Sequence, residues 1–138
     1  MRRLLSTTIA TVALAAGVVI STSTPAAAES APGCGPVVQI GDTGYIKVSG
    51  QTAASVKQFK GCGKNWAYAY VWKSFRDTHS SWRISAGVET PSQVVGWNTS
   101  TGNEVWSDGA NTLDVCTQAY SELNTNGIEY RGWTDTRC

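Results

Sequence analysis

The sequence has few of the side chains that hold metal ions or phosphate groups. Among its 138 residues there is a single histidine, His79, and the four cysteines never occur at Cys-x2-Cys spacing. A tetrahedral zinc site needs several such ligands close together, and a phosphate-binding loop needs a glycine-rich motif that is also missing. We therefore expect no metal site and no cofactor.

The sequence also lacks an excess of charge of either sign. The chain carries 11 basic and 10 acidic residues, and charged residues make up only 15% of it. Nucleic-acid-binding domains normally have a basic excess, so we expect no nucleic-acid partner. Six tryptophans, five tyrosines and two phenylalanines, together with this low charge, exclude an intrinsically disordered chain.

The first 28 residues have the features of an export signal. Two arginines precede an apolar stretch from residue 4 to residue 20, and small residues follow it up to Ala28. This order is typical of a secretory signal peptide that is cleaved after Ala28. A membrane anchor is the other interpretation, but threonines and alanines dilute the apolar stretch. We predict a signal peptide over residues 1–28, one secreted β-rich domain over residues 29–138, and no membrane contact after cleavage.

All four cysteines follow this leader, and an oxidising compartment would join them in two disulfides. Four cysteines allow three pairings, and a turn helps to choose among them. Asn126-Gly127 is typical of a type I′ hairpin turn. Counted outward from this turn, the opposed pairs are Leu123 with Tyr130, Glu122 with Arg131, Tyr120 with Trp133, Thr117 with Thr136, and Cys116 with Arg137. Cys138 is then one residue out of register, an offset that a β-bulge would absorb. We predict the disulfide Cys116–Cys138 and, by elimination, Cys34–Cys62.

Short runs with period-two alternation recur between turn residues, and no long segment keeps helical spacing. This pattern predicts an all-β fold, a small antiparallel β-sandwich or barrel of about seven strands. The expected elements are a hairpin over Val37–Val48 with its turn at Gly41–Gly44, strands over Asn65–Trp72 and Trp82–Val88, a hairpin joining Val94–Trp97 to Glu104–Trp106 through Asn98–Asn103, and the hairpin at Asn126-Gly127. The segment Thr112–Leu123 has a second interpretation, a short helix capped by Thr112.

One expected strand carries an aromatic stripe, Trp66, Tyr68, Tyr70 and Trp72, because alternate side chains share a face. The stripe is either part of the core or a platform that stacks on a sugar ring, a peptide or a partner protein. Soluble proteins seldom expose four aromatic rings without a partner, which favours the core. The polar edges of Tyr and Trp keep the platform open as an interpretation. The other tryptophans, Trp97, Trp106 and Trp133, are scattered in the sequence and are each expected in the core or at its rim.

Catalytic candidates are sparse. His79 lies in a polar loop with Asp77 and Ser80 nearby, but triad members usually come from separate segments, and no Gly-x-Ser-x-Gly elbow is present. The carboxylates available for glycoside hydrolysis are Glu89, Glu104, Asp108 and Asp114. Their role would depend on a separation in space that a sequence does not give. We expect no catalytic residue and no enzyme activity, with a small secreted hydrolase as an alternative.

Two stretches resemble known groups of exported proteins. Ser81-Trp82-Arg83-Ile84-Ser85 resembles the Trp-Arg-Tyr inhibitory loop of tendamistat-type α-amylase inhibitors, which are β-sandwiches with two disulfides. That resemblance implies Trp82 and Arg83 as binding residues, whereas simple alternation explains the same residues as a plain strand. The segments Gly61–Gly63, Glu104–Leu113 and Cys116-Thr117 resemble exported actinobacterial proteins of uncharacterised function.

These observations predict a monomeric, secreted, non-enzymatic protein that meets a partner through aromatic side chains. An extracellular or cell-envelope polysaccharide, or a secreted protein, would contact the stripe from Trp66 to Trp72. The alternative is an inhibitor of a secreted amylase or protease, which would present the loop Thr78–Arg83 or Asn98–Asn103.

Overall fold

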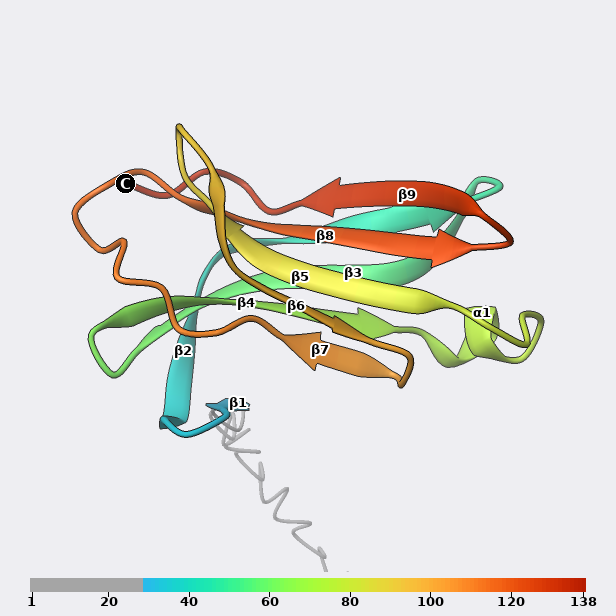
Figure 1. Cartoon of the computed structure of the whole chain (residues 1–138), viewed down its shortest axis with the longest axis horizontal. Helices are drawn as coiled ribbons and strands as arrows, with labels where there is room; N and C mark the ends of the chain where they lie inside the picture. The colour runs from blue at the N-terminus through green and yellow to red at the C-terminus, as the bar shows by residue number, and fades with distance from the viewer. Residues whose placement is uncertain (1–28) are drawn as a thin grey trace, which may run out of the picture.

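The computed structural model describes residues 29–138, and the expected signal peptide over residues 1–28 lies outside the described residues. Nine strands and one helical turn make up the described chain (Figure 1). The strands are β1 (Glu29–Ala31), β2 (Gly35–Val48), β3 (Gln51–Gly61), β4 (Lys64–Val71), β5 (Arg83–Glu89), β6 (Val94–Ser100), β7 (Glu104–Trp106), β8 (Gln118–Thr125) and β9 (Ile128–Trp133), and the helix is α1 (Lys73–Arg76). The predicted all-β class is confirmed, with nine strands instead of about seven.

Two antiparallel sheets pack face to face. The first has the strand order β1-β2-β3-β4-β7 and the second the order β6-β5-β8-β9. Figure 1 shows β3 and β4 running alongside β5 and β8, the strands whose facing side chains form the core. The domain therefore has two outer faces, one on each side of the sandwich.

The hairpin predicted between residues 94 and 106 is wrong, because its two strands belong to different sheets. β6 pairs with β5, whereas β7 pairs with β4 and places Trp106 opposite Tyr68. The Val71 N–H donates a hydrogen bond to the Asn103 carbonyl oxygen at 2.7 Å, which holds the start of β7 against β4. The chain thus crosses from the second sheet to the first over residues 101–103.

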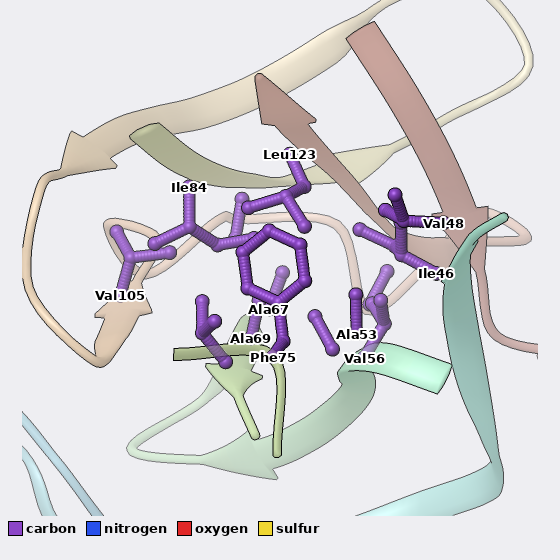
Figure 2. Close-up of a cluster of buried hydrophobic side chains, with 14 of the residues drawn as sticks. Ile46, Val48, Ala53, Val56, Ala67, Ala69, Phe75, Ile84, Val105 and Leu123 are labelled. Carbon is purple, nitrogen blue, oxygen red and sulfur yellow. The ribbon is translucent and has the colours of Figure 1, made fainter. Parts of the chain in front are cut away.

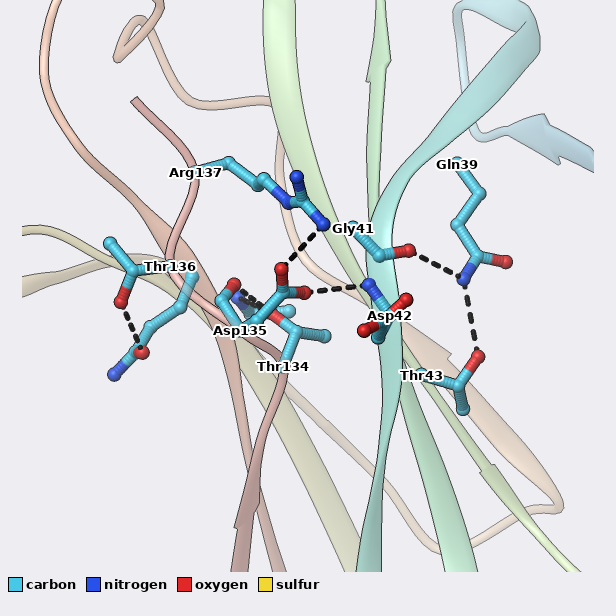
Figure 3. Close-up of polar contacts among 10 residues, drawn as sticks. Gln39, Gly41, Asp42, Thr43, Thr134, Asp135, Thr136 and Arg137 are labelled. Atoms are coloured by element: carbon cyan, nitrogen blue, oxygen red, sulfur yellow. Dashed lines mark hydrogen bonds and ion pairs between the residues drawn. The ribbon is translucent and has the colours of Figure 1, made fainter.

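The turn predicted at residues 41–44 is also wrong, because these residues form an irregularity within the long strand β2. β2 pairs with β3 on both sides of the irregularity, and the reversal comes at Ser49-Gly50, where both residues have a positive φ. A segment distant in sequence holds the irregularity in place (Figure 3). The Asp135 carboxylate accepts a hydrogen bond from the Asp42 backbone N–H at 2.6 Å and pairs with Arg137 at 2.6 Å.

Beyond this irregularity, β2 passes directly against β9. A Cβ atom at Gly44 would lie 1.9 Å from the Trp133 carbonyl oxygen, so only glycine fits where the two backbones meet. β2 of the first sheet and β9 of the second sheet therefore lie against each other along one side of the sandwich.

The main core lies between the sheets and is built almost entirely from aliphatic side chains (Figure 2). The alternation predicted for β5 is confirmed, since Ile84, Ala86 and Val88 are fully buried there. The small side chains of β4 face the same core, and they are Ala67, Ala69 and Val71. Burial of this apolar surface is the main stabilising contribution to the sandwich.

The C-terminal hairpin follows the predicted register. Leu123 lies opposite Tyr130, and Tyr120 lies opposite Trp133. Further from the turn the register shifts by one residue, so that Thr117 pairs with Arg137 instead of Thr136. Both predicted disulfides, Cys34–Cys62 and Cys116–Cys138, are confirmed. They fit an oxidising extracellular setting.

The helical interpretation of residues 112–123 is wrong, because β8 occupies residues 118–125. The short helix α1 lies instead directly after β4, and its Phe75 side chain enters the main core. None of the helices formed by residues 29–138 has the length and apolar composition needed to cross a membrane.

Candidate functional site

The aromatic stripe of β4 points away from the main core, but half of it is covered. Trp66 and Tyr68 are buried in a second hydrophobic cluster together with Phe59 of β3. The N-terminal segment, residues 29–37, contributes the apolar side chains that cover this cluster. For this half of the stripe the core interpretation holds.

The other half of the stripe forms one wall of a groove. Tyr70 is half-buried and Trp72 is 43% exposed, and their rings meet edge to face with centroids 5.5 Å apart. Tyr45 of β2 lies opposite Ser55 of β3, which lies opposite Tyr70 of β4. Because the buried Ser55 side chain is short, this row leaves a hollow between two aromatic side chains. The hollow, which we call the groove, encloses about 350 Å³.

Polar side chains line the groove beside these rings. Glu29 of β1 and Lys57 of β3 form an ion pair at 2.7 Å, and the Thr43 side chain also reaches the groove. An ammonium group has three donors and a carboxylate has several acceptor positions, so one mutual contact leaves both groups able to bind a ligand. The groove therefore offers donors, acceptors and aromatic rings side by side.

Tyr68 lines the groove from its buried end. Its hydroxyl donates a hydrogen bond to the Glu104 carboxylate at 2.5 Å. Burial raises the pKa of Tyr68 well above its usual value, and the hydrogen bond to Glu104 raises this pKa further. Tyr68 is therefore a protonated hydrogen-bond donor at neutral pH and not an activated nucleophile.

Arg76 fixes the position of Tyr70. Its guanidinium carbon lies 5.8 Å from the centroid of the Tyr70 ring, a cation–π distance. Its Nη2 also donates a hydrogen bond to the Tyr70 hydroxyl at 3.4 Å. A ring that is held in place in this way loses little conformational entropy when a ligand packs on it.

Trp82 and Arg83, the residues of the inhibitor-like stretch, lie apart from the groove. Trp82 is half-buried beside Phe75, and its indole N–H donates a hydrogen bond to the Gly102 carbonyl oxygen at 2.9 Å. Arg83 is exposed and lines a hollow on the outer face of the second sheet. The structure therefore does not bring these two side chains together with the stripe.

The candidate catalytic groups are dispersed. His79 stacks on Phe75 in a separate small hollow, with its Nδ1 atom 3.0 Å from the Phe75 carbonyl oxygen. Among the carboxylates named above, Glu89 contacts Gln118, Asp108 contacts Asn98, and Glu104 contacts Tyr68. Over residues 29–138 no group of three or more His, Cys, Asp or Glu side chains is placed to hold a metal ion.

A second aromatic group was not predicted from the sequence. Trp97 and Trp133 lie far apart in sequence, yet both stack on Tyr120 on the outer face of the second sheet. The third of the scattered tryptophans, Trp106, packs instead on Phe59 in the covered cluster. The hairpin register already placed Tyr120 opposite Trp133, but nothing in the sequence spacing connects Trp97 to them.

Comparisons with protein-family models, curated proteins and solved structures gave no match for this chain.

Proposed function

We propose that this protein is a secreted, monomeric, non-enzymatic module that binds an extracellular or cell-envelope polysaccharide in the groove on β2, β3 and β4. One observation carries the proposal. Exposed aromatic rings lie in the groove beside side chains that donate and accept hydrogen bonds.

A sugar ring has the two properties that this groove complements. Its C–H faces are apolar and pack on aromatic rings such as Tyr45 and Trp72. Its hydroxyl groups both donate and accept hydrogen bonds, which matches the ion pair of Glu29 and Lys57. The volume of about 350 Å³ falls in the range of small-ligand sites, whereas a stable protein interface needs a much larger surface.

Four features support export and a non-enzymatic role. The leader over residues 1–28 and the two disulfides agree with export to an oxidising compartment. Among residues 29–138, Glu29 is the one carboxylate that lines the groove, whereas glycoside hydrolysis ordinarily uses a pair. The protonated Tyr68 hydroxyl favours binding over nucleophilic chemistry.

Sedimentation with insoluble glycans tests the proposal. Wild-type protein is mixed with cellulose, chitin, starch granules or purified bacterial cell walls, and we expect at least one of them to remove it from the supernatant. Trp72→Ala and Tyr45→Ala each remove an exposed ring, and each should weaken retention roughly tenfold. Tyr68→Ala is avoided because it would damage the covered cluster.

The matched control is Leu113→Ala. Leu113 is 44% exposed, as Trp72 is 43% exposed, but it does not line the groove. Retention of this variant should equal that of the wild type. Wild-type protein that stays in the supernatant with every glycan would overturn the proposal, and inhibition of amylases or secreted proteases by that same protein would favour the inhibitor instead.

A further inference from the structure

The outer face of the second sheet carries an aromatic row that the groove does not use. Trp97 of β6 and Trp133 of β9 lie on either side of Tyr120 of β8. The ring centroids are 5.5 Å and 5.1 Å apart, and the ring planes are inclined by 28° and 22°. Tyr120 is buried between the two indoles, which are themselves 39% and 42% exposed.

Two glycines build this row. Gly87 of β5 has no side chain between β6 and β8, and a Cβ atom there would lie 2.8 Å from Cε3 of Trp97. A register shift places Gly96 and Trp97 together opposite Gly87, with Gly96 at a φ of 69°. This is a β-bulge, a device that redirects a side chain. The Asp108 N–H fixes the bulge by donating a hydrogen bond to the Gly96 carbonyl oxygen at 2.9 Å.

A row of polar side chains runs beside the aromatic row. The hydroxyls of Ser85 and Thr99 lie 2.8 Å apart. Next to them Glu122 lies 3.7 Å from Arg131, which also pairs with Glu129 at 2.5 Å. A hollow of about 370 Å³ is bordered by Trp97 and by the polar side chains of this row other than Arg131.

We propose that this face is a second polysaccharide-binding surface, so that one domain bridges two glycan chains, one on each side of the sandwich. The inference rests on the proposed function, because it assigns the same class of ligand to both faces. Each surface combines exposed aromatic rings with hydrogen-bonding side chains, and both sets are held in place by contacts within the domain.

The charges on this second face favour a neutral glycan over a charged peptide or a protein as its ligand. Arg83 and Arg131 balance Glu122 and Glu129, so the surface has no excess of either sign with which to attract a charged peptide. The cores of protein interfaces are depleted of glutamate, whereas here glutamates lie directly beside the aromatic row. An uncharged polysaccharide matches the balanced charge of this face, and its hydroxyl groups match the hydrogen-bond donors and acceptors that the face presents.

Particle clustering tests this inference. Wild-type protein is added to dilute suspensions of microcrystalline cellulose, chitin particles, starch granules and purified cell walls, and clustering is followed by light scattering while sedimentation measures retention. We expect the protein to cluster the particles of any glycan that retains it. Clustering should fall when protein is in excess, because separate protein molecules then occupy the glycan chains and few molecules bridge two of them. The double variant Trp97→Ala/Trp133→Ala should still be retained through the groove, but clustering should drop at least tenfold. Leu113→Ala should cluster particles like the wild type.

The outcomes separate this inference from the proposed function. If no particle retains the wild type, the proposed function fails and the bridging with it. If the wild type is retained but never clusters particles, or if the double variant clusters them equally well, the second surface is overturned and the groove stands. If the wild type forms a dimer without glycan and the double variant is a monomer, this face serves self-association. That result would also overturn the inference.

Discussion

The two outer faces of the sandwich carry the same kinds of side chain in different settings. On the first sheet apolar side chains of residues 29–37 pack with the buried Trp66 and Tyr68, and only the far end of the stripe reaches solvent. On the second sheet Trp97 and Trp133 stay 39% and 42% exposed. A stripe of aromatic residues is therefore core or surface according to what covers it, and the pattern within one strand does not decide between the two.

The largest expected effect separates a covered ring from an open one. Phe59 is 2% exposed at the centre of the covered cluster, so Phe59→Ala should lower the free energy of unfolding by about 3–5 kcal/mol. Trp133→Ala removes a ring that is 42% exposed and should cost about 1 kcal/mol or less. Urea denaturation measures both, and equal losses would contradict the difference between the faces.

The next effect comes from the disulfide Cys34–Cys62, which links the segment of residues 29–37 to the turn between β3 and β4. Replacing Cys34 and Cys62 by serine opens a link across 28 residues and should lower the free energy of unfolding by about 3–4 kcal/mol. Amide hydrogen exchange in residues 29–37 should also become faster, because this segment loses its covalent link to the turn between β3 and β4. Replacing Cys116 and Cys138, which are 22 residues apart, should cost a similar amount and leave exchange in residues 29–37 slow. Slow exchange in both variants would show that the Cys34–Cys62 disulfide does not hold residues 29–37 in place.

Alkaline pH sharpens the comparison in a third way. Burial, followed by hydrogen bonding to Glu104 and Glu122 respectively, raises the pKa of Tyr68 and of Tyr120 above the unfolded value of 10.0. Each contribution to stability is complete below about pH 10 and is lost as the pH rises toward the higher folded pKa, because only the unfolded chain releases these protons. Tyr68→Phe and Tyr120→Phe should each flatten this alkaline decline, since each removes one group whose pKa is higher in the folded chain than in the unfolded chain. Identical declines in urea titrations from pH 9 to pH 12 for wild type and both variants would contradict this assignment.

The smallest expected effect on stability lies at the side of the groove. Lys57→Gln removes the ion pair with Glu29, whose two side chains are partly exposed. Such pairs contribute about 0.2–1 kcal/mol, and molar salt should reduce the difference from the wild type. Glycan retention should fall at the same time, since Lys57 lines the groove. A variant that retains glycan normally would remove Lys57 from the binding surface.

The sequence predicted the C-terminal hairpin best, because its information is local. Asn126-Gly127 selects one turn type, and counting outward from it is reliable as far as Trp133. The disulfide to Cys138 follows from the same count plus one bulged residue. Alternation in β5 was equally informative, because Ile84, Ala86 and Val88 lie on one face of the strand and all three pack in the main core.

The sequence could not predict features that depend on distant contacts. β3 was missed because Ala53, Ala54, Ser55 and Val56 are all buried, so its period-two pattern is lost. The glycines of residues 41–44 indicate a turn until Asp135, 93 residues away, ties Asp42 into a continuous strand. The aromatic row at Tyr120 spans three strands of one sheet. The hairpin register connects Tyr120 with Trp133. For Trp97 the local signal is Gly87, a glycine inside a strand, which often marks a close approach of another group.

The most direct test of the account uses the indole N–H resonances of the six tryptophans. The domain is titrated with soluble cello-, chito-, malto- and xylo-oligosaccharides, and each indole signal is assigned by substitution. We predict that Trp72, Trp97 and Trp133 shift with at least one of these sugars while Trp66, Trp82 and Trp106 stay unchanged. Shifts confined to the covered indoles, or none with any sugar, would contradict the claim that the open rings of the two outer faces are where this protein contacts glycan.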